Sequence, residues 1–332
     1  MSVWPAPSVR HADRMDTRNR SPIVEWLLEG DPSVRWQVLR DLEHGPDAAV
    51  RSEREKIATS GWGARLLAEQ GADGRWAGGL YSPKWTSTTY TLLLLLWLGL
   101  PRGNEQALAG CRVLWDGATF FGGGLTLAKT VKVPEACITG MLVLLAASFG
   151  YHDDRIEPAV EWLLDNQLAD GGWNCAAIRT GSTHGSFHTS ITVLEALHAY
   201  ASAGGAVPVR SSLRDGRDFF LNHSLFRSHR SGKVVDTAFT RFPFPPQWHF
   251  DVLRGLEHFR LSGADRDARL DDAIHVLRNA RGPDGRWPRH QPYPGRYWFT
   301  LEQPGQSRLA TLRALRVLDW WKTDIRAGSF GS

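Results

Sequence analysis

Three segments of this chain end in the same short pattern, and that repeat restricts the possible folds more than any other feature. In each, the last turns of an amphipathic helix are followed by Asp-Gly, one further residue and a tryptophan, at residues 65–76, 162–173 and 276–287. The turn requires a residue that tolerates positive φ, and a glycine supplies it in every copy. Three copies predict a chain built from a repeated helical hairpin.

Each repeated turn is followed by a loop and then by a more apolar segment. Residues 89–100 are hydrophobic all round and residues 138–149 nearly so. A helix that is apolar on every side has to be buried on every side. The segments between them, such as residues 157–168, have one apolar and one charged face. We therefore expect inner and outer helices to alternate, and no segment of useful length has the alternating pattern of a strand.

Six inner helices can be aligned on their apolar pattern. Their expected starts are 51, 49, 53, 61 and 59 residues apart, at Arg35, Thr86, Glu135, His188, His249 and Arg308. Each interval is long enough for one helical hairpin with its loops. The sequence therefore predicts an all-α fold, a closed α/α barrel that forms one domain over residues 21–325, with residues 1–20 loosely attached.

Composition and charge exclude several classes of protein. The 332 residues are 42% hydrophobic and 22% charged, which is typical of a globular chain, and the net charge of +4 is not concentrated in a basic stretch of the kind that binds nucleic acid. Three cysteines cannot form a disulfide framework. The first 20 residues lack the apolar core of a signal peptide, and the apolar run 92–100 is too short to span a bilayer. We therefore expect a cytoplasmic protein.

The segment 162–173 fits the Gln-Trp repeat of the superfamily of terpenoid cyclases and protein prenyltransferase β-subunits. That repeat is an aromatic-Leu pair, three residues, Gln, three residues and Gly-x-Trp. The other copies depart from it at Arg65, Val276 and Arg281. The chain also looks like the bacterial proteins called squalene-cyclase or prenyltransferase repeat proteins. The resemblance implies an α6/α6 toroid, with six inner and about six outer helices, whose central cavity opens where the inner helices begin.

In such a toroid the starts of the inner helices form a ring around the mouth of the cavity. Two residues beyond each start, the ring continues with Gln37, Thr88, Cys137, Ser190, Asp251 and Ala310. One side of the ring collects the residue types that bind Zn²⁺, namely Glu135, Cys137, His188, His249 and Asp251. On the other side Arg35 and Arg308 are neighbours once the barrel closes, and they are suited to bind a phosphate or carboxylate.

Protein prenyltransferases are similar in this region, because their zinc site takes Asp-x-Cys from one inner helix start and His from the next. Glu135-Ala-Cys137 and His188 are the matching residues here, with Glu in place of Asp. The predicted zinc ligands are Cys137, His188 and Asp251. Alternatively, Cys137 is a small core residue, or the site consists of His184, His188 and Cys175. Arg35 and Arg308 would then cap carbonyls or pair with Glu135 and Asp251.

The resemblance also specifies what is missing. Squalene-type cyclases begin an inner helix with Asp-x-Asp-Asp-Thr, whose central acid protonates the substrate, and Cys137 occupies that position here. The leading hypothesis is therefore an isoprenoid-handling enzyme that performs metal-assisted prenyl transfer or a non-standard terpene cyclisation. Its catalytic residues would be Glu135, Cys137, His188, His249 and Asp251. Arg35 and Arg308 would bind the anionic head group, an isoprenoid diphosphate, while an apolar wall is formed by Trp85, Tyr90, Trp36 and Trp248.

Two other functions and one further element complete the predictions. α/α barrels also host glycosidases, in which Glu135 and Asp251 would be the acid/base pair of a hydrolase or lyase. A non-catalytic toroid that binds a lipid is the third possibility. Residues 226–247 form a long loop that combines basic residues with Phe239, Phe242 and Phe244, and such loops are commonly functional. This loop is expected either to cover the cavity as a lid or to pack over the outer helices.

Overall fold

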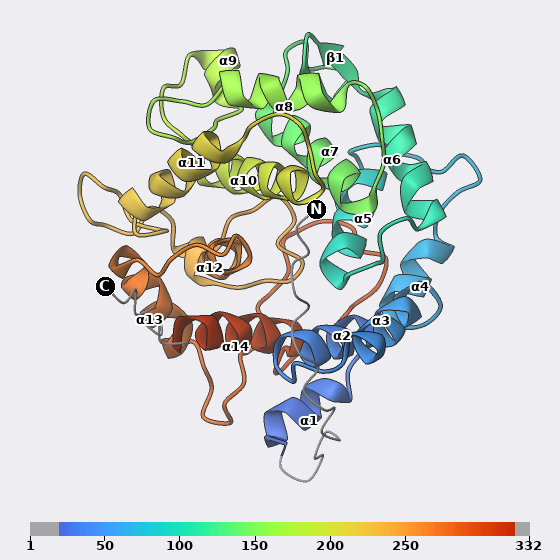
Figure 1. Cartoon of the computed structure of the whole chain (residues 1–332), viewed down its shortest axis with the longest axis vertical. Coiled ribbons are helices and arrows are strands. Elements are labelled where there is room, and N and C mark those ends of the chain that lie inside the picture. Colours follow the sequence, from blue (N-terminus) through green and yellow to red (C-terminus); the bar gives the residue numbers. More distant parts are fainter. Residues whose placement is uncertain (1–19, 323–332) are drawn as a thin grey trace, which may run out of the picture.

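The computed structural model describes residues 20–322, and in that range the chain is mostly helical, as predicted (Figure 1). The predicted loose segment 1–20, apart from Arg20, lies outside the described residues. None of the described helices is long and apolar enough to cross a membrane. The α-helices are α1 Pro22–Leu28, α2 Pro32–Asp41, α3 Asp47–Glu55, α4 Gly61–Ala68, α5 Thr88–Leu98, α6 Glu105–Gly117, α7 Ala136–Phe149, α8 Ile156–Asp165, α9 Ala176–Thr180, α10 Phe187–Ser202, α11 Arg210–Asn222, α12 Val252–Leu261, α13 Asp271–Asn279 and α14 Arg308–Lys322.

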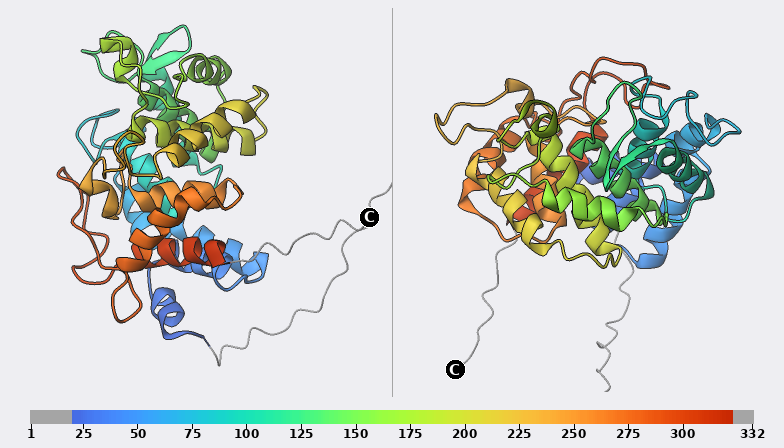
Figure 2. Two further views of the ribbon diagram at one scale, coloured as in Figure 1. Left: turned by 90° about the vertical axis from the view of Figure 1, so that its left-hand side faces the viewer. Right: turned by 90° about the horizontal axis from the view of Figure 1, so that it is seen from above.

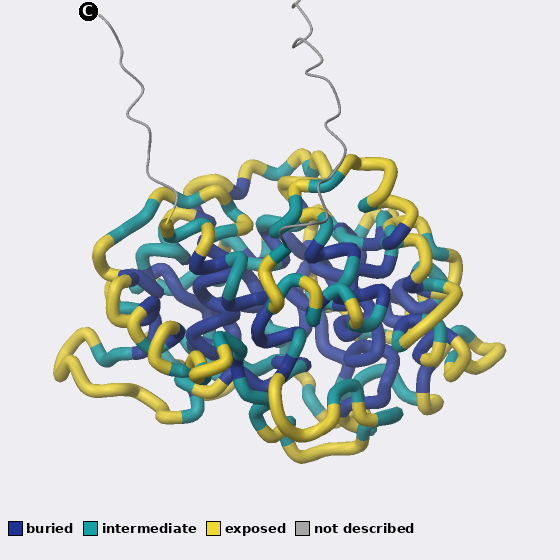
Figure 3. Tube along the Cα trace, turned by 90° about the horizontal axis from the view of Figure 1, so that it is seen from below, coloured by how far each residue is buried: buried dark blue, intermediate teal, exposed yellow. Residues whose placement is uncertain are grey.

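Six of these helices lie around the centre of the molecule: α2, α5, α7, α10, α12 and α14. Each is preceded in the chain by a helix nearer the surface, and the burial pattern in Figure 3 places the buried segments in the middle and the exposed ones around them. The last central helix, α14, packs against the first, α2, where Arg316 forms an ion pair with Asp41 at 3.2 Å. The alternation of inner and outer helices is therefore as expected from the sequence.

The tryptophan of each repeated turn is fully buried and makes the same hydrogen bond in all three copies. Its indole N–H donates to the carbonyl ten residues earlier, in the helix that precedes the turn. The bonds are Trp76 to Leu66 at 2.7 Å, Trp173 to Leu163 at 2.7 Å and Trp287 to Leu277 at 2.9 Å. The glycines of the turns have the positive φ that was predicted, between 78° and 86°. The tryptophan thus fastens each loop to its outer helix.

A second hydrogen bond fastens the same turn to the following inner helix. The backbone N–H of the tryptophan donates to a buried hydroxyl, and the equivalent bond from Leu125 identifies a fourth copy of the turn without its tryptophan. The pairs are Trp76 with Thr88, Trp173 with Ser190, Trp287 with Thr311 and Leu125 with Thr139, at 2.9 to 3.1 Å.

These hydroxyls correct the alignment of the inner helices. The apolar pattern matched Thr88 and Ser190 with Cys137 and Ala310, whereas the hydrogen bonds match them with Thr139 and Thr311. The predicted register was therefore wrong by two residues in α7 and by one in α14. In α7 the physical reason is that a helix apolar on every side has no apolar stripe, so its pattern does not define a rotational phase.

One pair of strands was not predicted. Strands β1 Thr119–Phe121 and β2 Gly124–Thr126 are antiparallel, with Phe120 opposite Leu125. Gly122 and Gly123 make the two-residue turn between them with φ of 58° and 125°, which L-residues other than glycine rarely adopt. The strands are too short to show a period of two in the sequence.

Two long segments cover the starts of the inner helices. Residues 226–250 include the predicted lid, and there Phe239 and Phe250 pack against Phe187 at the start of α10. Residues 288–307, which were not predicted to cover anything, run as a long loop, orange-red in Figure 2. This loop reaches α5 through a hydrogen bond from the Trp298 indole to Thr91 at 3.0 Å. The predicted lid therefore packs against the inner helix α10, and through the ion pair of Arg227 with Asp272 it also contacts the outer helix α13.

Candidate functional site

A central cavity of about 310 Å³ is lined by residues from all six inner helices. Its walls combine aromatic and aliphatic side chains, among them Trp36, Trp97, Leu144, Phe244 and Leu312. Most lining residues come from the second and later turns of the helices, because segments 226–250 and 288–307 cover the helix starts. The inner-helix starts, where the ring of site residues was expected, therefore supply little of the cavity lining.

Charged side chains enter the same cavity from the middle of the inner helices. Arg254 on α12 forms a two-point ion pair with Glu195 on α10, with N–O distances of 2.9 and 2.6 Å. A third bond, 2.7 Å long, runs from Arg254 Nη1 to the carbonyl of His249. Arg254 is almost fully buried, and such a residue needs this number of partners to offset the loss of its hydration.

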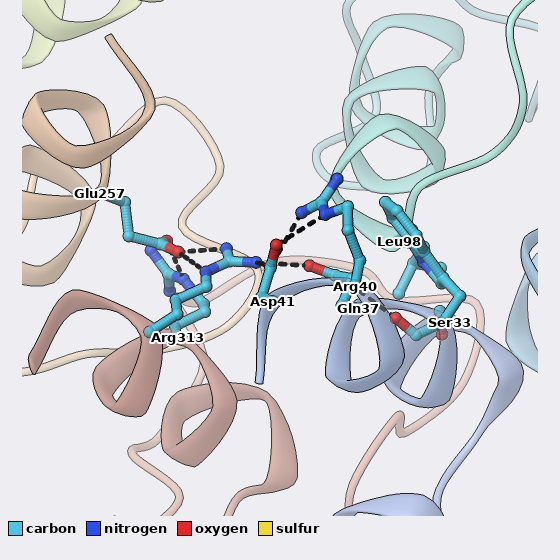
Figure 4. A network of polar contacts seen from close by, with 9 residues as sticks. Ser33, Gln37, Arg40, Asp41, Leu98, Glu257 and Arg313 are labelled. Atoms are coloured by element: carbon cyan, nitrogen blue, oxygen red, sulfur yellow. Dashed lines mark hydrogen bonds and ion pairs between the residues drawn. The ribbon is translucent and has the colours of Figure 1, made fainter. Parts of the chain in front are cut away.

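Glu257, one turn further along α12, connects three inner helices (Figure 4). It accepts hydrogen bonds from Arg313 and Arg316 of α14. Arg316 also donates to Gln37 at 2.7 Å and to Asp41 at 3.2 Å, both on α2. Burial would raise the pKa of Glu257, but Arg313 and Arg316 outweigh it and hold that pKa at about 2. Glu257 is therefore ionised at neutral pH.

Arginines outnumber the carboxylates that pair with them around the cavity. Five arginines line it; four of them pair with the three carboxylates Asp41, Glu195 and Glu257, and the fifth, Arg54, bonds the carbonyl of Gly99. The guanidinium groups of Arg40 and Arg54 lie over the Trp36 ring, 4.4 and 4.7 Å from its centre. Burial and the nearby Arg40 lower the pKa of Arg54. The cavity thus carries an uncompensated positive charge next to an apolar wall.

Two nitrogens of residues that line the cavity have no partner among the described residues: Arg313 Nη1 and His258 Nε2. Arg313 Nη1 makes no hydrogen bond, although Arg313 Nε bonds Glu257. A buried donor without an acceptor is unfavourable by roughly 1–3 kcal/mol, and more when it is charged. Arg313 therefore has a charged donor for which the described residues supply no acceptor.

Asp251 lies one turn before Arg254, on the same face of α12. Its side chain is completely buried; Oδ1 caps the helix by accepting the N–H of Arg254 at 2.8 Å, and Oδ2 has no partner among the described residues. Burial raises the pKa of Asp251 to about 6, against the opposing effect of Arg313 and Arg254. A carboxyl group of this pKa can hold a proton and release it near neutral pH.

The structure brings together five of the predicted site residues at the inner-helix starts, with Tyr293 from segment 288–307. The His249 ring lies between the rings of Trp248 and Tyr293, with centroid distances of 3.8 and 3.5 Å. Trp85 packs edge-on against Tyr90 at 4.7 Å, and His188 lies 5.7 Å from His249. We call Trp85, Tyr90, His188, Trp248, His249 and Tyr293 the aromatic cluster. Burial lowers the pKa of both histidines to about 4, so they are neutral at pH 7.

Two predicted anion-binding residues are not part of the cavity lining. Arg35 bonds Glu53 at 2.6 Å and the carbonyl of Gly30 at 2.7 Å. Arg308 bonds the carbonyl of Trp26 at 2.9 Å. Both arginines therefore cap carbonyls, as the alternative interpretation expected, but their carboxylate partners are Glu53 and Glu29 and not Glu135 and Asp251. Of the predicted wall residues, Trp36 is the one that lines the cavity.

The predicted zinc ligands do not form a metal site. His188 Nδ1 accepts the N–H of Phe250 at 2.8 Å, so the proton of the neutral ring is on Nε2 and no lone pair is left for a metal. Asp251 Oδ1 caps α12. Among the described residues there is no group of three or more His, Cys, Asp or Glu side chains arranged to hold a metal ion, which includes the alternative set with His184. The residues present therefore do not fit Zn²⁺.

Cys137 instead contacts Cys175, a residue that the leading hypothesis did not use. Their sulfur atoms are 2.7 Å apart, and Cys175 Sγ also accepts the backbone N–H of Cys137 at 3.1 Å. Contact with Cys137 lowers the pKa of Cys175. Glu135, which caps the start of α7, accepts the Thr126 hydroxyl at 2.8 Å.

The cavity residues that the sequence analysis missed share one signal. Each is a charged residue inside an inner helix, in the first turn for Arg254 and beyond the first turn for Glu195, Glu257, Arg313 and Arg316. A charged side chain in a helix that is buried on all sides must be paired or must line a cavity. Applied to the inner helices, that rule would have found the cavity network, whereas only the helix starts were considered.

No protein-family model matches the chain, and no curated protein is significantly similar to it. The structure is similar to that of the type II terpene cyclase MstE from Scytonema without ligand, with a TM-score of 0.44, 17% sequence identity, and coverage of 87% of this chain and 88% of that one. The structure is also similar to that of a variant of MstE in complex with geranylgeranyl dihydroxybenzoate, with a TM-score of 0.45, 16% sequence identity, and coverage of 87% of this chain and 86% of that one.

Proposed function

We propose that this chain is an isoprenoid-handling enzyme. In this proposal the six inner and six outer helices form a closed α6/α6 toroid, and its central cavity binds a small apolar substrate with an anionic head group. The single observation that carries the proposal is the buried, unpartnered Nη1 of Arg313 in a cavity whose walls are otherwise largely apolar.

The two ends of such a substrate would meet different surfaces. Its hydrocarbon part would contact the rings of Trp36, Trp97 and Phe244. These apolar surfaces suit an alkene, which forms no hydrogen bonds of its own. Its head group would accept a hydrogen bond from Arg313 and lie in the field of Arg40 and Arg54. A guanidinium group is the side chain best suited to bind phosphate or carboxylate oxygens.

Asp251 is the member of the predicted catalytic set whose surroundings fit a chemical role. In a non-standard cyclisation the protonated carboxyl would give its proton to one carbon of a double bond and leave a carbocation on the other. The rings of the aromatic cluster would stabilise that positive charge, and loss of a proton from the product would complete the reaction. None of Asp251, Glu135, His188 and His249 lines the cavity, although Asp251 and the carbonyl of His249 both bond the lining residue Arg254, and the catalytic roles of all four stay predictions. The metal-assisted form has no described ligand set to support it.

Binding separates this proposal from its rivals. We expect geranyl diphosphate to bind at least about tenfold more tightly than geraniol, since only the former uses the arginines. Arg313→Met should remove that preference and leave the affinity for geraniol unchanged. Because this substitution leaves Glu257 with one partner fewer, Arg40→Met serves as a second variant at a more exposed arginine. Arg227→Met is the matched control, since Arg227 pairs with Asp272 at the surface and does not line the cavity. Equal binding of alcohol and diphosphate would contradict the proposal.

The products formed from geranyl diphosphate would show which reaction the enzyme catalyses. Release of inorganic diphosphate from geranyl diphosphate in the presence of an acceptor indicates prenyl transfer, whereas a cyclic product that keeps its diphosphate indicates cyclisation. Asp251→Asn should abolish the second and spare the first. Binding without either product would identify the lipid-binding toroid. Hydrolysis of an oligosaccharide that is lost with Glu135→Gln would identify the glycosidase.

A further inference from the structure

We propose that Cys137 and Cys175 form a redox pair, which closes to a disulfide when a low-molecular-weight disulfide such as oxidised glutathione is the oxidant. The two residues come from different repeats: Cys137 lies in the first turn of α7, and Cys175 immediately precedes α9. This inference is independent of the proposed function, because neither cysteine lines the cavity.

The geometry needs little change for the bond to form. The sulfur atoms are 2.7 Å apart, and a disulfide has a sulfur–sulfur distance of about 2.0 Å. Both residues are half-buried, so a small disulfide has a route to them, whereas the third cysteine, Cys111, is 1% exposed inside α6. Cys111 thus serves as an internal control for nonspecific oxidation.

The contacts around Cys175 favour it as the attacking sulfur. Its Sγ accepts the backbone N–H of Cys137 at 3.1 Å, in the first turn of α7, where the N–H groups have no partner inside the helix. The Thr189 hydroxyl is a second donor, at 3.7 Å. Donors at a helix N-terminus stabilise a thiolate, which is the reactive form of cysteine.

The exchange balances in two steps. The Cys175 thiolate attacks one sulfur of oxidised glutathione, forming a mixed disulfide and expelling one glutathione thiolate. The Cys137 thiolate then attacks Cys175 Sγ in that mixed disulfide, forming the Cys137–Cys175 bond and expelling the second glutathione thiolate. The two protons released by the protein thiols are taken up by the two glutathione thiolates, and two electrons pass from the protein to the oxidant.

The bond would fix α9 and the loop after Trp173 to the start of α7. Tyr81 and Tyr90 lie close enough to Cys137 for their titration to be coupled to it. Oxidation would therefore restrain the end of the barrel where the predicted ring residues lie, while the arginines of the cavity stay in place.

The test is to equilibrate the full-length reduced protein with mixtures of reduced and oxidised glutathione, quench with acid, denature, and alkylate with iodoacetamide. The expected result is the loss of two of the three alkylatable thiols, with an intact mass lower by two hydrogens before alkylation and a linked peptide containing Cys137 and Cys175. Cys111→Ser should oxidise like the wild type. Cys137→Ser should stop at one glutathione adduct on Cys175, and that adduct is expected even if the variant is less stable, because it reports reactivity and not folding.

A melting experiment adds a readout that does not depend on labelling. The oxidised wild-type protein should melt several degrees higher than the reduced protein, and Cys137→Ser should show no such difference. Three alkylatable thiols at every glutathione ratio would overturn the proposal. So would adducts that never resolve in the wild type, or a linked peptide that contains Cys111.

Discussion

The stability of the fold should depend on pH through Asp251, and Asp251→Asn should remove that dependence. Asn keeps an oxygen that can accept the N–H of Arg254, so the cap of α12 is retained. What it removes is the ability of a completely buried side chain to ionise. The substitution therefore isolates the free energy of burying one negative charge beside Arg313.

The magnitude follows from the shift in pKa. Burial raises the pKa of Asp251 from 3.8 to about 6, so the folded protein binds this proton more tightly than the unfolded chain does. The stabilisation is fully present below pH 3.8 and is lost as pH rises through about 6. A shift of this size corresponds to about 3 kcal/mol. As pH rises through that range, the free energy of unfolding of Asp251→Asn should thus increase by about 3 kcal/mol relative to that of the wild type.

Urea unfolding of both proteins, followed by tryptophan fluorescence from about pH 4 to about pH 7, measures this difference directly. Taking the difference cancels the titration of all other groups that the two proteins share. Asp236→Asn is the control, because Asp236 caps a short helix through the same kind of bond to Ala238 but is exposed. A difference between Asp251→Asn and the wild type that does not change with pH would refute the reasoning, since it would mean that burial does not hinder ionisation at Asp251.

Three further predictions concern stability. Thr311→Val keeps the shape of the side chain but leaves the Trp287 N–H without an acceptor. Urea unfolding should therefore show a free energy of unfolding lower by about 1–3 kcal/mol. The control is Thr180→Val on the surface, which should lower it by less than about 0.5 kcal/mol. Glu257→Gln leaves Arg313 and Arg316 without their shared carboxylate and should lower the free energy of unfolding by about 3–5 kcal/mol; a loss below about 1 kcal/mol would mean that the pair is not desolvated. Gly216→Ala would bring a Cβ within 2.7 Å of Leu194 and 2.9 Å of Trp173, so overpacking should cost about 1–3 kcal/mol, whereas Gly204→Ala meets no neighbour and tests backbone strain alone.

The helical repeat was predictable because its signal is local. Asp-Gly-x-Trp requires a positive φ at glycine and a place for a large apolar ring, and the same indole bond to the carbonyl ten residues earlier recurs in every copy. The fourth copy could not be recognised from its tryptophan, because Leu125 stands in its place. Its hydroxyl partner Thr139 lies in an apolar helix, where a hydroxyl can also bond the backbone of its own helix. The sequence alone therefore does not identify Thr139 as the acceptor for the Leu125 N–H.

The candidate site was harder to predict because it depends on which ends of the helices are covered. Segment 288–307 closes the helix starts through Trp298, a contact between residues more than two hundred positions apart, and no local pattern foretells it. The predicted ring contained both His188 and His249, whose rings lie 5.7 Å apart, but most residues that line the cavity come from later turns of the helices.

Charged residues inside the inner helices are the strongest sign that this fold is built around a ligand. Arg254, Glu257 and Arg313 could be replaced by apolar residues of similar volume with little loss of stability, because buried ion pairs seldom repay their desolvation. A chain that needed only a stable barrel would have no use for an arginine whose Nη1 stays buried without a partner. An anion bound there supplies the missing acceptor, so it should stabilise the folded state in proportion to the logarithm of its concentration. In the proposed function, the guanidinium group that is unfavourable without a ligand is the one that would bind the head group of the substrate.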